Sequence, residues 1–174
     1  GVADIEAGGD VDFAVAAVFG SSLNVDADQN GGTNATITDS TGSVDVTGTT
    51  TLDAGATPGS ITLDNADNNF RDNVTISSAA ALVIDDTDDI TFNAVNATGT
   101  AAYTAVTILT ILRVSVFGCA LSFYAKQNGV HDATIPDSTG QYDVAGLTTL
   151  ATCVTSRSSQ LSNCHHTFKQ SLTT

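Results

Sequence analysis

The chain has 174 residues, a formal net charge of −14 and a pI near 4.1, with 19 acidic residues against 5 basic ones. This excess of negative charge repels the phosphates of nucleic acids and anionic membrane surfaces, so a nucleic-acid partner is excluded. The length suits one domain or a short stack of repeats, and the many Asp, Gly, Thr and Val residues favour strands and turns over helices.

The first polar motif has the opening of a calcium-binding loop. Asp26, Asp28 and Asn30 place oxygen atoms at alternate positions, and a glycine follows for the turn. The twelfth position of such a loop would fall on Ile37, which offers no closing carboxylate. We therefore favour a solvated turn and keep a calcium site as the alternative.

Seven short segments alternate apolar with polar residues and are separated by Asp, Asn or Gly. They are residues 35–38, 43–47, 50–53, 60–64, 73–77, 82–85 and 90–93. Each pattern predicts a short strand with one buried face, bounded by turns. We expect the side chains of Ile37, Val46, Leu63 and Ile76 to point into a common core.

Three Asn-x-Thr triplets occur among these segments, beginning at Asn34, Asn73 and Asn96. In a secreted protein such triplets are acceptors for N-linked glycans, so the three asparagines are glycosylation candidates. A chain rich in Asn and Thr also produces them by chance.

The run of four aspartates at residues 85–89 has the composition of an exposed acidic turn. Its carboxylates would also attract a cation, but a solvated turn explains the run without one.

Residues 101–125 are continuously apolar and long enough to cross a membrane. Arg113 lies in the middle of the segment and would cost about 2.5 to 3.5 kcal/mol at the bilayer centre. Consecutive buried strands are therefore favoured over a membrane span.

The chain contains an internal repeat with an offset of 98 residues. Residues 29–52 return as residues 127–150, with sixteen of twenty-four positions identical, and residues 18–20 return as 116–118. We expect an acidic repeat unit over residues 1–100, a diverged second copy over 101–153, and a tail over 154–174 without a counterpart in the first unit.

The cysteine and histidine residues do not predict a reactive centre. Cys119, Cys153 and Cys164 are odd in number, and His165 and His166 are adjacent, which prevents both from converging on one zinc ion. No nucleophile with a base and an orienting partner can be assembled from the sequence, so we do not expect an enzyme, and no cofactor other than calcium is indicated.

Residues 59–77, followed by residues 82–92, resemble the repeats of large bacterial exported adhesins of the filamentous haemagglutinin and autotransporter type. The resemblance implies an all-β fold, a right-handed parallel β-solenoid whose coils stack on their neighbours. In such a stack, aligned corner asparagines such as Asn65 and Asn69 would form hydrogen-bonded ladders. A two-sheet β-sandwich stays open as the alternative, because short strands at this spacing also fit one.

The expected function is a structural or adhesive segment of a secreted surface exoprotein, at the cell surface or outside the cell. Unpaired strands at the ends of a solenoid would allow end-to-end association into filaments, and the outer faces would contact glycans of a host or abiotic surface. The alternative is a module that binds carbohydrate or ice through threonine rows, such as residues 36–38 and 49–51.

Overall fold

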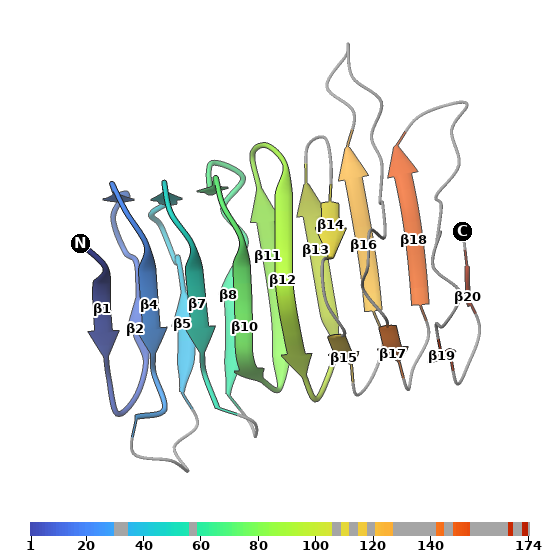
Figure 1. Cartoon of the computed structure of the whole chain (residues 1–174), viewed down its shortest axis with the longest axis horizontal. Helices are drawn as coiled ribbons and strands as arrows, with labels where there is room; N and C mark the ends of the chain where they lie inside the picture. The colour runs from blue at the N-terminus through green and yellow to red at the C-terminus, as the bar shows by residue number, and fades with distance from the viewer. Residues whose placement is uncertain are drawn as a thin grey trace.

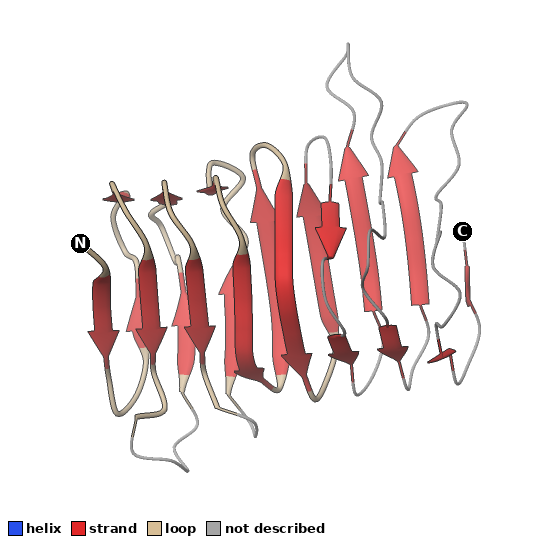
Figure 2. Cartoon of the chain, viewed as in Figure 1, coloured by secondary structure: helices blue, strands red, loops and turns tan. Residues whose placement is uncertain are grey.

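The computed structural model describes residues 1–29, 35–55 and 59–105 in full, together with the backbone of the strands that lie between Leu109 and Thr173. The described residues form β-strands and no helix (Figure 2). Neighbouring strands within each sheet pair in parallel, which is the pattern of a chain that winds into stacked coils. The predicted all-β parallel solenoid is confirmed.

Three sheets run along the solenoid. The first sheet holds, in order, β1 (Ala3–Glu6), β4 (Leu23–Asp26), β7 (Thr50–Asp53), β10 (Val74–Ala79), β12 (Ile90–Ala97), β15 (Ser115–Phe117), β17 (Tyr142–Val144) and β19 (Thr167–Phe168), with β14 (Leu109–Ile111) also paired to β12. The second holds β2 (Val11–Asp12), β5 (Thr36–Thr38), β8 (Ser60–Leu63), β11 (Ala81–Asp86), β13 (Ala101–Ala105), β16 (Leu121–Lys126), β18 (Thr148–Cys153) and β20 (Leu172–Thr173). The third holds β3 (Ala17–Phe19), β6 (Val44–Val46) and β9 (Asn69–Phe70).

The winding is right-handed, as the resemblance implied. In Figure 1 the near strands β1, β4 and β7 run downward, the far strands β2, β5 and β8 run upward, and the chain advances from left to right. This parallel pairing of successive coils also excludes the β-sandwich, whose neighbouring strands are antiparallel.

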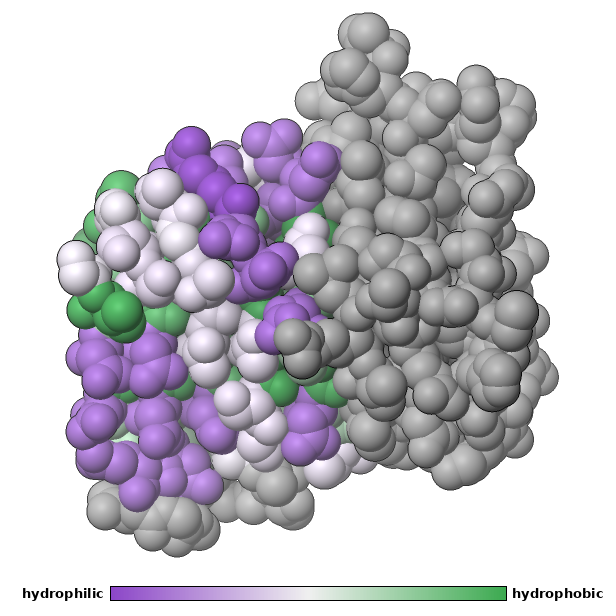
Figure 3. Space-filling model, viewed as in Figure 1, coloured by the Kyte–Doolittle hydropathy of each residue, from purple (hydrophilic) through white to green (hydrophobic). Residues whose placement is uncertain are grey.

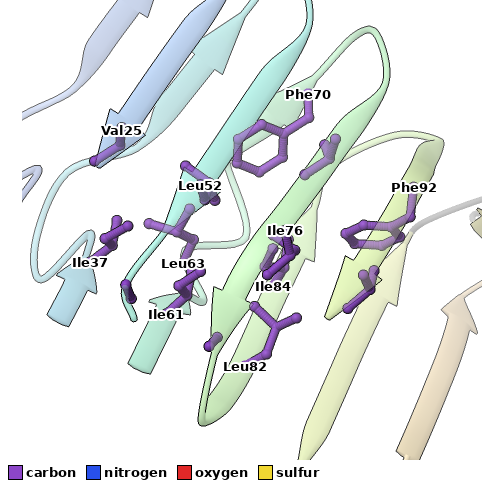
Figure 4. Packing of buried hydrophobic residues seen from close by; sticks show 14 of the residues in the cluster. Val25, Ile37, Leu52, Ile61, Leu63, Phe70, Ile76, Leu82, Ile84 and Phe92 are labelled. Carbon is purple, nitrogen blue, oxygen red and sulfur yellow. The ribbon is translucent and has the colours of Figure 1, made fainter. Parts of the chain in front are cut away.

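The core is a set of aliphatic rows between the sheets (Figure 4). Because each strand alternates its side chains, every second residue points inward and stacks on the same position of the next coil. Val25, Leu52 and Ile76 form such a row on the first sheet, and full burial of each side chain contributes about 1.5 to 3 kcal/mol. The four residues expected to point inward are all buried, namely Ile37, Val46, Leu63 and Ile76.

The coil of residues 81–97, which follows β9, has two sides, whereas the coils before it have three. The step from one strand to its neighbour in the first sheet is 27 residues between Leu23 and Thr50, but only 18 between Val74 and Phe92. The third sheet ends at β9, so the coil that follows, residues 81–97, needs fewer residues to close.

The 98-residue repeat continues to the end of the chain. In the first sheet the steps from β1 to β4, β7 and β10 are 20, 27 and 24 residues, and in the second sheet the steps from β13 to β16, β18 and β20 are the same. β19 lies 98 residues after β9, so the segment expected to be a tail, residues 154–174, contains a strand at the position that the repeat assigns to β9. Sequence identity is low there, whereas strand spacing is kept.

Equivalent strands of the two copies lie in different sheets. β1 belongs to the first sheet, while β13, which lies 98 residues later, belongs to the second. The repeat therefore advances by a whole number of coils plus about half a coil, and the second copy is turned to the opposite side of the solenoid.

Candidate functional site

The outer face of the first sheet carries a polar row. The strand register aligns Asp4, Asn24, Thr51 and Thr75 on successive coils. The Asn24 side-chain amide donates to the Asp4 carboxylate at 2.6 Å, and Asn93 of β12 donates to the Thr75 hydroxyl at 3.3 Å. Parallel strands repeat about every 4.8 Å, so the row is a ladder of regularly spaced donors and acceptors.

A second, acidic row lies beside it. Glu6, Asp26 and Asp53 are aligned at the ends of their strands. Figure 3 shows hydrophilic residues gathered over the near side of β1 and β4, where these two rows begin. We call the two rows together the polar face.

The turns that follow the acidic row use its carboxylates locally. Asp26 accepts the backbone N–H of Asp28 at 3.1 Å, and Asp53 accepts that of Gly55 at 3.0 Å. Gly55 has φ of 82°, and a Cβ there would lie 2.5 Å from the Asp28 Oδ2 atom, so this position requires glycine.

The calcium candidates are divided between described and undescribed residues. Asp26 is the last residue of β4, Asp28 lies in the turn that follows, and Asn30 lies outside the described residues. Among the described ranges no group of three or more acidic, histidine or cysteine side chains is placed to hold a metal ion. Calcium binding by Asp26, Asp28 and Asn30 stays a prediction.

The glycosylation candidates differ in accessibility. Asn96 is exposed on β12 and donates its side-chain amide to the Ser77 carbonyl at 3.2 Å. Asn73 is partly buried just before β10, and Asn34 lies outside the described residues. Of the two described asparagines, Asn96 is the better placed for a glycan.

A buried hydrogen-bond network joins two coils at the corner between the second and third sheets. Asp39 accepts the N–H groups of Asp64 and Asn65, both at 3.1 Å, and the side-chain amide of Asn68 at 2.7 Å. The side-chain amide oxygen of Asn68, Oδ1, accepts the Val44 N–H at 2.8 Å. The sequence pointed to Asn65 and Asn69, but the fully buried amide is that of Asn68. The motif Asp-Ser-Thr-Gly that begins at Asp39 is identical in both copies of the repeat, and this identity could have marked Asp39 as structurally important.

Asp86 ends the third sheet. Its carboxylate accepts the N–H of Phe70 in β9 at 2.7 Å, where the next strand would otherwise bond, and that of Asp88 at 2.7 Å. Burial raises the pKa of Asp86 to about 7, against the lowering effect of these two donors, and the carboxylates of Asp88 and Asp89 raise it further. The exposed acidic turn expected at residues 85–89 is thus wrong for Asp86, which is only 3% exposed.

On the first coil, Asp12 has the opposite environment. It accepts the Ser40 hydroxyl at 2.7 Å, the Ser40 N–H at 3.0 Å and the Thr38 hydroxyl at 3.0 Å. The Ser40 hydroxyl and N–H lower the pKa of Asp12, because both bonds favour the ionised form.

A polar pocket of about 280 Å³ lies where the third sheet stops. Its lining includes Arg71, Asp72, Asn73 and Asp89. The Arg71 guanidinium is held by a two-pronged bond to Asp45, with Nε at 2.9 Å from Oδ1 and Nη2 at 2.8 Å from Oδ2. The positive charge of Arg71 is therefore neutralised by the Asp45 carboxylate.

The second sheet carries the hydroxyl patch, which consists of Thr36, Thr38, Ser60 and Thr62. The register aligns Thr36 with Ser60 and Thr38 with Thr62, and all four are partly exposed. The other threonine row expected at residues 49–51 does not form, because the Thr50 side chain is fully buried.

The cysteines and histidines considered in the sequence have side chains outside the described residues. In the described part of the chain, no helix is long and apolar enough to cross a membrane.

Comparison with known families gives one match. Neither the curated proteins nor the solved structures include a significant match to this chain. A family model described as repeats of unknown function (DUF5649) matches residues 1–77. This segment ends within β10 and contains β3, β6 and β9 of the third sheet, so the part of the chain that builds the polar face and the hydroxyl patch is similar to that repeat family.

Proposed function

We propose that the chain is a rod-like structural segment of an exported surface protein and that it adheres through its polar face. The observation that supports this is the in-register stacking of outer polar residues on successive coils. Such stacking presents a repeated surface rather than one enclosed site. The resemblance of residues 59–77 and 82–92 to exported adhesins points to the same role.

The chemistry of the polar face favours glycans as the partner. Asp4, Asn24 and Thr51 offer acceptors and donors that match sugar hydroxyl groups, and many weak contacts in register add through multivalency. The negative charge of Glu6, Asp26 and Asp53 disfavours anionic surfaces.

The test is binding of the purified chain to arrayed neutral glycans and to glycan-coated surfaces. Replacing Asp4 and Asn24 by Ser is expected to reduce binding at least tenfold, with the circular dichroism spectrum unchanged. The matched control replaces Thr36 and Thr38 by Ser on the hydroxyl patch and keeps full binding. Equal binding by both variants, or cleavage of any glycan by the native chain, would contradict the proposal.

Placement at the cell surface has a separate test. Antibodies raised against this chain are expected to label intact cells that produce the parent protein, without permeabilisation. Labelling that requires permeabilised cells would contradict an extracellular or surface location.

The hydroxyl patch favours a second candidate function, binding of ice or of an ordered carbohydrate surface. Thr36 and Thr38 face outward in register with Ser60 and Thr62, giving a small flat array of hydroxyls. Ice-growth inhibition that is lost in Thr38→Lys and kept in Thr51→Lys would favour this function over the first.

A further inference from the structure

The N-terminal end of the solenoid has an open edge. β1, β2 and β3 each pair on one side only. Ile5 and Phe19 are only partly buried there, whereas Val25, aligned with Ile5 one coil later, is fully buried. The core side chains of the first coil are thus covered from one direction alone.

The backbone hydrogen bonds show which amides face this edge. Ala3 and Ala7 donate their N–H groups to the carbonyls of Ser22 and Asp26 in the next coil. Because successive N–H groups of a strand point in opposite directions, those of Asp4 and Glu6 face the open edge.

The second copy of the repeat shows what covers the equivalent strands. β13, β14 and β15 lie 98 residues after β1, β2 and β3. On its N-terminal side β13 pairs with β11, while β14 and β15 both pair with β12. The covering coil is therefore the two-strand coil of residues 81–97.

The core residues of this coil match the open end. In the second copy, residues of this coil pair with residues of β13, β14 and β15, among them Ile111 of β14. Subtracting 98 from the number of each partner gives the equivalent residue at the open end. The resulting pairs are Leu82 with Ala3, Ile84 with Ile5, Ile90 with Val11, Phe92 with Phe13, and Ala97 with Phe19. Every pair is apolar, and the five residues of the coil are at most 1% exposed where they now lie.

We propose that β1 to β3 form an interaction surface for one more coil of this repeat, of the two-strand type formed by residues 81–97. The surface accepts it by continuing both sheets and covering the half-buried core residues. This inference stands on strand register and does not rest on the proposed adhesion.

The same equivalence bears on end-to-end contact. β19 and β20 lie 98 residues after β9 and the start of β10, and in the first copy a two-strand coil follows those strands before the next unit begins. Two copies stacked directly would lack that coil. A stack of copies that keeps the register found within this chain would therefore place a coil of the 81–97 type between one copy and the next.

One position of the new contact is unfavourable. Asp85 pairs with Thr104, and the residue 98 positions before Thr104 is Glu6. Two carboxylates would lie side by side, so Glu6→Thr is expected to strengthen the contact.

The experiment fuses a second copy of residues 77–98 directly before Gly1. Gly1 is equivalent to Gly99, so the graft continues into the chain without a linker. Hydrogen exchange of the Asp4 and Glu6 amides is measured by NMR in the native chain, in the fusion, and in a control fusion whose graft carries Leu82→Asp and Ile84→Asp. We expect at least tenfold slower exchange in the fusion, unchanged exchange in the control, and a further slowing with Glu6→Thr.

Three results would overturn the proposal. The first is equal exchange in the native chain and the fusion. The second is a native chain that sediments as a dimer with Asp4 and Glu6 already protected, since a second copy would then cover the end directly. The third is loss of protection in β7 of both the fusion and its Glu6→Thr form, because the added coil would then disrupt the stack. Loss of glycan binding alone would leave the inference standing.

Discussion

Thr50 presents a buried hydroxyl group inside an aliphatic row. Its side chain is fully buried, its Oγ1 atom has no hydrogen-bond partner among the described residues, and its register neighbours are Leu23 and Val74. Replacing Thr50 by Val keeps the shape and the β-branch but removes the unpaired polar group. We predict that Thr50→Val stabilises the protein.

The magnitude follows from two contributions. Removing an unsatisfied buried hydroxyl recovers about 1 to 3 kcal/mol of desolvation. The new methyl group adds up to about 0.8 kcal/mol of apolar burial. We therefore expect the free energy of unfolding to rise by about 1 to 3 kcal/mol, since partial losses in repacking offset part of the sum.

Urea unfolding followed by circular dichroism is the assay. The expected result is a higher midpoint with an unchanged m-value, because the exposed surface of the unfolded chain stays the same. Thr51→Val is the matched control, since Thr51 lies in the outward row of the same strand and should gain little. A Thr50→Val protein no more stable than the native one would refute the reasoning and indicate that the hydroxyl is satisfied.

Three further predictions concern the corners. Asp86 binds its proton more tightly when folded, with a pKa of about 7 against 3.8 in an exposed group, so its contribution to stability is full below pH 4 and is lost as pH rises toward 8. Between pH 5 and pH 8 the free energy of unfolding should fall by about 3 kcal/mol, which urea unfolding at each pH would measure. Asp86→Asn should remove this dependence of stability on pH. A native protein whose stability does not change with pH would contradict the prediction. Asn68→Ala should cost about 2 to 4 kcal/mol, because the Val44 N–H loses its acceptor and Asp39 loses one of its three donors. Asn69→Ala should cost much less in the same assay. Gly55→Ala should cost about 1 to 2 kcal/mol because Gly55 has a positive φ, and more if the Asp28 side chain cannot move away from the new Cβ. Gly20→Ala should be near neutral, because there is open space around Gly20. Equal thermal midpoints for the two variants would refute this account.

The two-residue period of the strands made their buried faces predictable from the sequence. Ile37 and Leu63 each stand between polar neighbours, and both point inward as expected. The repeat showed that one architecture occurs twice, although its extension through residues 154–174 became visible only from the strand spacing. The predicted polar surface also followed from alternation, since the partners of inward residues must face water.

Only the tertiary structure decided which of several equivalent polar residues is buried. In the run Thr49 to Thr51 each residue has the same chemistry, so the sequence offered no contrast from which to place Thr50 inside. In the run of aspartates at residues 85–89, Asp86 is buried because β9 ends the third sheet beside it and needs an acceptor. Coils of different length close around a shared core, and this closure decides where the third sheet stops. It also decides which side of the solenoid each copy faces. That closure involves contacts between residues a full coil apart, which a local pattern does not record.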